Sequence, residues 1–286
     1  MSSDSSAPKV WTPPSHIEDL YARTAGNKFA STNAPTAGAR NDKEVPVGTA
    51  PFQLYSLGTP NGAKVGIILE ELGIEYDAHF VSLGGSQFDK GFVQINPNSK
   101  IPAAVDLDGP DHQPINLFES ASIMLYLAEK HGKFLPASPR LRTEVISWLF
   151  WQIGGQGPMT GNFGHFFVYA PEDQIEARNY GVARYGMETQ RLCDVLDKHL
   201  KDREYIVGDE VTIADFAIFP WFNMLRIGSG YKHPSGVIGG EFLGVSRYHN
   251  LNRWAERIAA RPGVQRGLQV CTGGVGKPWL EKPASL

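Results

Sequence analysis

The chain has 286 residues, 42% of them hydrophobic and 20% charged, a normal balance for a globular protein of one or two domains. Its net charge of −3 disfavours a nucleic-acid-binding protein, because such proteins neutralise phosphates with an excess of basic side chains. No apolar run reaches the roughly 18 residues of a membrane span, and the N-terminus lacks the apolar segment of a secretory signal, so we expect a cytoplasmic protein.

Residues 1–50 form the first segment, which is rich in Ser, Ala, Pro, Thr and Asn and has little periodicity. This composition is typical of an extended N-terminal arm. Five apolar side chains interrupt it: Val10, Trp11, Leu20, Tyr21 and Phe29. Because apolar side chains are stabilised by burial, we expect part of the arm to pack against the rest of the protein.

Strand and helix patterns alternate from residue 51 to residue 133. In the first helical pattern, Val65, Leu69 and Leu72 recur at helical spacing and Gly73 ends the run. The expected strands are 52–57, 76–83, 103–107 and 114–118, and the expected helices are 61–73, 86–96 and 120–132. This order predicts a compact α/β domain with one four-stranded sheet, in which the last two strands form a hairpin.

The strand patterns stop after a linker with two prolines at 133–140. Long helical patterns follow at 140–159, 175–200, 211–227 and 248–263. They predict an all-helical domain over residues 140–267, with residues 268–286 as a tail of little pattern. Thr212 and Asp215 have the spacing of a capping box, which would fix the start of the third of these helices.

Four short motifs occur in order along these two segments. They are YSLGTPNGAKV at 55–65, SKIPA at 99–103, FESASIMLYLAEK at 118–130 and GDEVTIADF at 208–216. Together they make residues 27–268 resemble the glutathione transferases. The Thr-Pro-Asn loop resembles the nu class of bacterial and fungal members, which is related to the yeast nitrogen-regulator protein. The resemblance implies a thioredoxin-like N-terminal domain, an all-α bundle domain behind it, a homodimer, and glutathione as the substrate.

Thr59, Pro60 and Asn61 stand where the first strand pattern gives way to a helix. Thr is a good N-cap and Pro is favoured at the first helical position, so plain capping explains two of the three residues. A helix N-terminus also favours an anion and lowers the pKa of a thiol. A fall from about 8.5 to about 6.5 would raise the thiolate fraction at pH 7.4 from roughly 7% to roughly 90%. The resemblance implies that Thr59 and Asn61 donate hydrogen bonds to the sulfur of bound glutathione.

Lys100, Ile101 and Pro102 precede the third expected strand, where a proline at a strand edge is the ordinary interpretation. The resemblance implies instead a cis Ile101–Pro102 bond, beside which the backbone pairs with bound glutathione as with an added strand. Glu119 and Ser120, between a strand and a helix, would ordinarily be first-turn capping residues. The resemblance implies that Ser120 binds the γ-glutamyl carboxylate of glutathione and that Glu119 pairs with its ammonium group.

Four further polar residues match glutathione contacts of the family, although each would ordinarily be a solvated side chain. Gln87 matches a residue that contacts the glycyl end of glutathione. Asn33 matches an arm residue that reaches the active site. Arg184 and Gln152 match residues that meet a second glutathione in the nu class.

Two glutathiones in one site suit the reduction of a small disulfide. One thiolate attacks the disulfide, and the second glutathione resolves the mixed disulfide to oxidised glutathione and a reduced thiol. No protein cysteine is needed. Cys193 lies on an apolar helix face and Cys271 in the tail, and neither is at the helix start where a redox cysteine belongs. The eight histidines lack metal-ligand spacing, so we expect no metal.

Two alternatives stay open. A transferase that conjugates electrophiles or reduces hydroperoxides would use a Tyr or Ser donor at the strand–helix junction, and Ser56 lies nearby. A non-catalytic regulatory protein on the same scaffold has the yeast regulator as its precedent, but that protein carries a long Asn/Gln-rich arm that residues 1–50 lack. The aromatic run at 163–169 is either core or the lining of a pocket for an apolar co-substrate.

Overall fold

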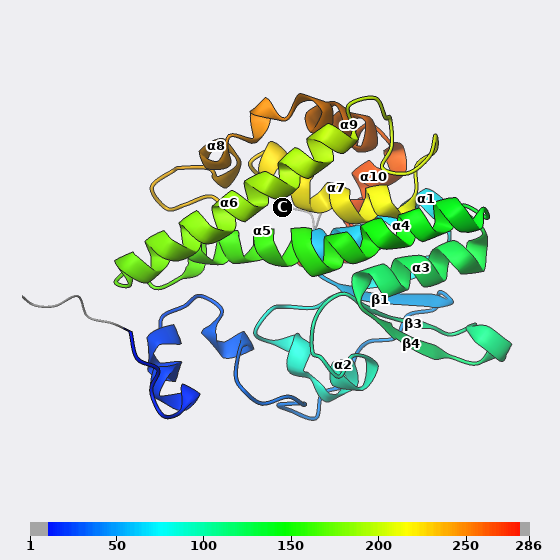
Figure 1. Cartoon of the computed structure of the whole chain (residues 1–286). Coiled ribbons are helices and arrows are strands. Elements are labelled where there is room, and N and C mark those ends of the chain that lie inside the picture. The colour runs from blue at the N-terminus through cyan, green and yellow to red at the C-terminus, as the bar shows by residue number, and fades with distance from the viewer. Residues whose placement is uncertain (1–10, 281–286) are drawn as a thin grey trace, which may run out of the picture.

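The computed structural model describes residues 11–280, apart from the Ser31 side chain, and Figure 1 shows a small sheet region beneath a layer of helices. The sheet region, residues 52–131, has the expected βαβαββα order. Its elements are β1 Phe52–Ser56, α1 Pro60–Leu72, β2 Tyr76–Phe80, α2 Lys90–Ile95, β3 Ala103–Asp106, β4 Ile115–Phe118 and α3 Ser120–His131. The strands are ordered β2-β1-β3-β4; β1 and β2 run parallel, and the other two pairs are antiparallel.

Strand β1 is buried along its whole length, because helices cover both faces of the sheet. Side chains alternate along a strand, so Phe52 and Leu54 join the large core that the sheet shares with α1, α3 and the helices above. Tyr55 belongs to the opposite face, where it packs with Phe92 and Ile95 of α2. The loop that follows β1 therefore starts from a strand that is supported on both sides.

The helical region, residues 139–267, begins with a longer helical run than expected. Its elements are α4 Pro139–Trp151, η5 Gln152–Gln156, α5 Gly157–Gly164, η6 His165–Tyr169, α6 Ile175–His199, α7 Ile213–Arg226, α8 Gly239–Leu243, η7 Val245–Arg247, α9 His249–Ala259 and α10 Pro262–Gly267. The stretch from α4 to η6 is continuous, with π turns at η5 and η6, so the aromatic run is helical. Helix α7 is almost wholly buried and begins at the expected capping box of Thr212 and Asp215. Within residues 11–280, no helix is long and apolar enough to cross a membrane.

The N-terminal arm packs in part, as expected. Phe29 meets the ring of Tyr169 edge-on, with 5.0 Å between ring centres. Figure 1 shows the arm, in blue, beside the end of the helical layer where α5 and α6 meet. Trp11 stays 74% exposed, and Val10 lies outside the described residues. Short helical turns of the arm and the sheet region are η1 Ile17–Thr24, η2 Ala30–Thr32, η3 Ser86–Phe88 and η4 Pro110–His112.

The tail, which shows little pattern in the sequence, packs against the sheet region through residues 268–280. Cys271 is completely buried, and its carbonyl accepts a hydrogen bond from the Gly58 N–H at 2.9 Å. The Lys277 ammonium lies 3.7 Å from the centre of the Tyr76 ring on β2. The last described residues therefore contact the loop between β1 and α1, more than 200 residues earlier in the chain.

Candidate active site

The junction of β1 and α1 carries the predicted catalytic residues, Thr59 as the N-cap and Asn61 in the first turn of the helix. Thr59 caps α1 with extended backbone, and its Oγ1 accepts a hydrogen bond from the Gly62 N–H at 3.2 Å. Pro60 follows at the first helical position. A side chain on Gly62 would lie 1.9 Å from the Leu57 carbonyl oxygen, so this turn requires glycine. Because the Thr59 oxygen acts as the acceptor, its O–H remains available to a ligand, and capping and ligand binding are compatible here.

Asn61 is held in place from the helical region. Its Oδ1 accepts a hydrogen bond from Nε1 of Trp221, on α7, at 3.0 Å. Because the oxygen is engaged, the amide nitrogen of Asn61 keeps its two protons for other acceptors. Trp221, 160 positions further along the chain, thus orients one of the two predicted catalytic side chains.

The loop before β3 contains the predicted cis bond, between Ile101 and Pro102. The Lys100 side chain is exposed, and the Lys100 carbonyl accepts a hydrogen bond from the Asn96 side-chain amide at 2.6 Å. This bond fixes the backbone directly before the cis peptide, where the resemblance expects glutathione to pair.

Gln87 is not the solvated residue of the ordinary interpretation, because it is only 1% exposed. Its Oε1 accepts a hydrogen bond from the Gly84 N–H at 2.9 Å, and its Nε2 donates to the Ser99 carbonyl at 3.0 Å. The oxygen end therefore braces the β2–α2 loop, and the nitrogen end joins this loop to the loop before the cis bond. The predicted contact of Gln87 with the glycyl end of glutathione stays a prediction.

Helix α3 begins at the predicted pair Glu119 and Ser120. Glu119 has left-handed backbone (φ 68°), an exposed side chain and no capping hydrogen bond. The first N–H groups of α3 thus receive no side-chain partner from their N-cap residue, which suits the binding of a carboxylate. Ser120 is buried, and its Oγ lies 3.3 Å from the Nζ atom of Lys64.

Lys64 is the residue of this site that sequence analysis missed. It lies on α1, is 2% exposed, and donates hydrogen bonds to Oε1 of Gln152 at 2.5 Å and to Ser120. Burial lowers the pKa of Lys64 to about 7, and the nearby charge of Glu119 opposes this shift. The sequence does carry a signal: Lys64 interrupts an otherwise apolar run, GAKVGIIL, in which a solvated charge has no place.

Three residues expected near the glutathiones differ in their surroundings. Gln152 is completely buried in η5, where Oε1 holds Lys64 and Nε2 has no hydrogen-bond partner among the described residues. Asn33 and Arg184 are exposed. Within the described part of the chain, neither makes a hydrogen bond to the loop around Thr59. Their contacts with glutathione stay predictions.

Residues 11–280 offer no thiolate or metal centre in place of a ligand thiol. Both cysteines are buried and unpaired, and burial raises the pKa of each thiol to about 12. No group of three or more His, Cys, Asp or Glu side chains in this range could hold a metal ion. Cys271 belongs to the tail, as expected, but its backbone contacts the loop before α1. Its carbonyl holds Gly58, next to Thr59, while its thiol donates to the His79 carbonyl at 3.6 Å.

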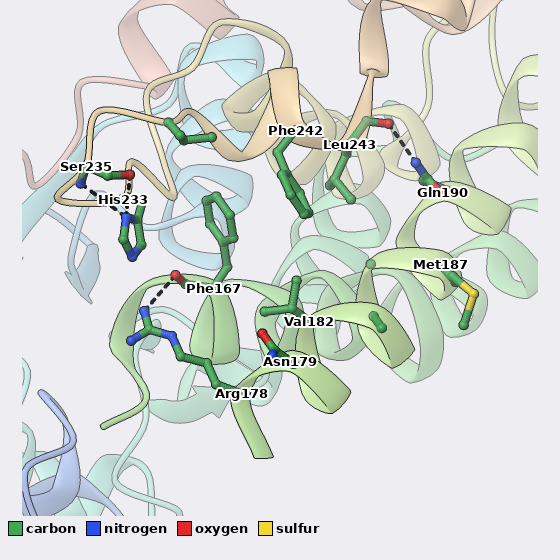
Figure 2. Close-up of a pocket in the computed structure, with 13 residues that line it drawn as sticks. Phe167, Arg178, Asn179, Val182, Met187, Gln190, His233, Ser235, Phe242 and Leu243 are labelled. Atoms are coloured by element: carbon green, nitrogen blue, oxygen red, sulfur yellow. Dashed lines mark hydrogen bonds between the residues drawn. The ribbon is translucent and has the colours of Figure 1, made fainter. Parts of the chain in front are cut away.

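A hollow of about 620 Å³ lies apart from these residues, between α6 and the segment 233–243. Figure 2 shows its apolar walls, including Phe167, Val182 and Phe242, and the Arg178 guanidinium donating to the Phe167 carbonyl. None of the predicted site residues lines it. The aromatic run at 163–169 therefore contributes both to the core and to a pocket lining. Phe163 is fully buried in the core, whereas Phe167 lines this hollow.

A smaller hollow of about 350 Å³ borders the catalytic loop itself. Thr59 and Pro60 form one side, Met224 of α7 forms another, and Leu268 contributes from the tail. The loop thus has open space beside it on the side of α7 and the tail.

Known proteins match both the sheet region and the helical region. The family model described as "Glutathione S-transferase, N-terminal domain" matches residues 59–130, and the one described as "Glutathione S-transferase, C-terminal domain" matches residues 186–262. Disulfide-bond oxidoreductase YghU of Escherichia coli (strain K12) is 48% identical in an alignment of 266 residues that covers 91% of this chain and 85% of that protein.

Two crystal structures share the fold. Glutathione transferase YghU from Streptococcus pneumoniae ATCC 700669, complexed with glutathione, is 45% identical, with a TM-score of 0.83 over 93% of this chain and 100% of that one. A glutathione transferase from Burkholderia graminis, with two glutathione molecules bound per subunit, is 42% identical, with a TM-score of 0.71 over 77% and 88%. These matches confirm a thioredoxin-like sheet domain followed by a helical domain, and the chain belongs to the glutathione S-transferase family.

Proposed function

We propose that this protein is a glutathione-dependent disulfide-bond reductase that uses the thiolate of bound glutathione rather than a protein cysteine. The observation that carries the proposal is the start of α1, where Thr59 and Asn61 keep free protons to donate beside a cis-proline loop. Both protein thiols are buried and have a raised pKa, so they compete poorly for this chemistry. The related Escherichia coli protein, named a disulfide-bond oxidoreductase, supports the same reaction.

The reaction balances with two glutathiones and one disulfide. The first glutathione thiolate attacks one sulfur of the disulfide, whose other sulfur leaves as a thiolate and takes up a proton. The second glutathione, as a thiolate, attacks the glutathione sulfur of the mixed disulfide. Oxidised glutathione and a second reduced thiol result. The Burkholderia graminis structure, with two glutathione molecules per subunit, supports a site with room for both.

The first glutathione lies along the sheet region in this proposal. Its γ-glutamyl carboxylate binds at Ser120 and the start of α3, and its ammonium pairs with Glu119. Its cysteinyl backbone pairs beside Ile101 and Pro102. Its glycyl end lies toward Lys100 and the loop that Gln87 braces. Residues 51–133 thus act as the glutathione-binding domain.

The second glutathione lies against the helical domain, residues 140–267, and the arm. Arg184 contacts it, and Asn33 reaches the active site from the arm; the exposure of both side chains is compatible with these roles. Gln152 supports the second glutathione indirectly, because it is buried and its side-chain oxygen already accepts a hydrogen bond from Lys64.

We also propose a nu-class homodimer in the cytoplasm. The Thr-Pro-Asn loop supports the class. Exposed apolar side chains on α4 and α6 support a protein interface there: Phe150 is 70% exposed, and Tyr180 and Met187 are similarly open. Two buried thiols without a disulfide fit a reducing compartment.

A conjugating transferase fits the geometry less well. That alternative relies on Ser56 as the donor to sulfur, but Ser56 is buried at the end of β1 and its Oγ faces the Leu57 carbonyl at 3.5 Å. Thr59 is the hydroxyl that stands at the start of α1.

Turnover of bis(2-hydroxyethyl) disulfide with glutathione, coupled to glutathione reductase, tests the proposal. We expect wild type and the double variant Cys193→Ala/Cys271→Ala to turn over at similar rates. If the double variant is folded but inactive, the chemistry runs through a protein thiol. If wild type binds glutathione without turnover, the conjugating or regulatory alternative is preferred.

A further inference from the structure

A buried polar cluster joins three separate elements of the protein. Lys64 from α1 lies between Ser120 at the start of α3 and Gln152 in the η5 turn, with its Nζ atom 3.3 Å and 2.5 Å from their side-chain oxygens. All three residues are buried. An isolated charge is costly in such a place, so a lysine here calls for an explanation other than solvation.

Lys64 sets the direction in which the Ser120 hydroxyl can donate. When Lys64 is protonated, its ammonium group has three donors and no acceptor, so Ser120 Oγ then accepts the hydrogen bond that joins the two residues. The hydroxyl proton of Ser120 is then left to point elsewhere. Gln152 accepts a second proton of Lys64 and so fixes the ammonium from the helical region.

We propose that Lys64 is a positioning residue for the γ-glutamyl carboxylate of glutathione, which holds the Ser120 hydroxyl as a donor and places a positive charge behind the start of α3. The inference rests on the proposed function, in which Ser120 and the first turn of α3 bind that carboxylate. It adds a residue that touches neither glutathione nor the reacting sulfur.

The charge of Lys64 is then coupled to ligand binding. Burial keeps the pKa of Lys64 near 7 in the free protein. A carboxylate bound at Ser120 favours the protonated form and raises that pKa. Above pH 7, binding therefore draws a proton from solution, and the affinity for the ligand falls as pH rises.

Glu119 is the charged group whose field acts on Lys64. On the helices that pack against α1, the other charged side chains have partners of their own, and His131 is exposed at the far end of α3. The ion pairs and hydrogen-bonded pairs are Glu70 with Arg266, Glu71 with Arg261, Asp106 with Lys130, Glu129 with Arg142, Arg226 with Asn223, and Asp215 with Thr212. Gln152 and Ser120 are neutral.

Calorimetric titration with S-methylglutathione tests this coupling, because the thioether has no thiol to titrate. At pH 7.5, titrations in two buffers of different ionisation enthalpy measure the protons taken up. A pKa near 7 in the free protein leaves Lys64 partly neutral at pH 7.5, so we expect wild type to take up a measurable fraction of a proton on binding. Lys64→Met should bind about tenfold more weakly, as expected for the loss of a charge-assisted contact, and take up none.

Lys201→Met is the matched control, because Lys201 is an exposed lysine of the helical region; it should match wild type in both measurements. Lys64→Gln, which keeps a hydrogen-bond donor without a charge, should also lose the proton uptake and serves if Lys64→Met unfolds. The inference is overturned if wild type binds without proton uptake, or if both Lys64 variants retain the uptake. Absence of any binding to wild type overturns the proposed function itself, and the inference with it.

Discussion

The starts of α1 and α3 face the same ligand in our proposal, yet they are built differently. At α1, Thr59 caps the helix with its own side chain, and the ligand meets neutral donors from Thr59 and Asn61. At α3, Glu119 provides no cap, and Lys64 lies behind the first turn. The start of α1 offers neutral side-chain donors, whereas the start of α3 offers free backbone N–H groups with a buried charge behind them.

The difference follows the charge of each ligand group. The sulfur of glutathione changes its charge during the reaction, and a thiolate that is stabilised too strongly becomes a poor nucleophile. Neutral donors at α1 therefore suit it. The γ-glutamyl carboxylate keeps its charge throughout, so strong stabilisation at α3 improves binding without slowing a chemical step.

The largest effect should come from the start of α1. Thr59→Ala removes the hydroxyl donor, and we expect kcat/KM for disulfide reduction to fall about a hundredfold. Thr59→Ser keeps the hydroxyl and should stay within about threefold of wild type. Steady-state turnover at pH 7.4 makes the measurement. Equal rates in wild type and Thr59→Ala would mean that the reactive thiolate forms elsewhere.

The start of α3 should affect binding more than chemistry. Ser120→Ala removes one donor to a permanent anion, so the KM for glutathione should rise about tenfold, while kcat falls far less than in Thr59→Ala. Ser122→Ala, an exposed serine on the same helix, is the control. If Ser120→Ala lowers kcat and leaves KM unchanged, the start of α3 acts on the chemical step and does not differ from the start of α1 in the proposed way.

Lys64 should make stability depend on pH. A lysine in the unfolded chain has a pKa of about 10.4, whereas burial lowers that of folded Lys64 to about 7. Between these values the unfolded chain binds more protons, so the free energy of unfolding rises with pH, by up to about 1.4 kcal/mol per unit. Below pH 7 both states are protonated and this dependence ends.

Denaturant unfolding of wild type and Lys64→Met at pH 6.5, 7.5 and 8.5 checks this dependence. The free energy of unfolding of the methionine variant should exceed that of wild type most at pH 6.5. This difference in stability should shrink as pH rises. A difference that is the same at all three values would mean that Lys64 keeps its ordinary pKa in the folded protein.

The smallest of these effects concerns the support of Asn61. Trp221→Phe keeps most of the packing but removes the N–H that holds Asn61 Oδ1, so kcat/KM should fall about fivefold. Trp148→Phe, in the aromatic cluster of α4, is the control and should leave the rate unchanged. If both variants behave alike, the hydrogen bond from Trp221 does not orient the catalytic amide.

Local patterns in the sequence predict much of this arrangement. The strand expected at 52–57, the Gly73 end of α1 and the Thr212 capping box depend on neighbouring residues, and all three are present in the structure. The cis bond before Pro102 was predicted by resemblance and is also confirmed. Thr59 as an N-cap follows from the chemistry of threonine alone.

The contacts that support the site could not be predicted in this way. Lys64 with Gln152, Asn61 with Trp221, and Gly58 with the Cys271 carbonyl join residues 88, 160 and 213 positions apart. No periodicity or capping rule relates residues at such separations, since only the tertiary fold brings them together. The burial of Gln87 does not follow from the sequence either, because its partners Gly84 and Ser99 lie on irregular loops that no periodicity describes.

The hydrogen bond between Gly58 and Cys271 has a consequence for how the enzyme is made. The loop before α1 is synthesised well before the carbonyl that holds it, because Cys271 follows Gly58 by 213 residues. A nascent chain can therefore form its sheet long before this loop is fixed. Truncation before residue 271, or a fusion that pulls these residues away, would remove the hydrogen bond that holds the Gly58 N–H next to Thr59.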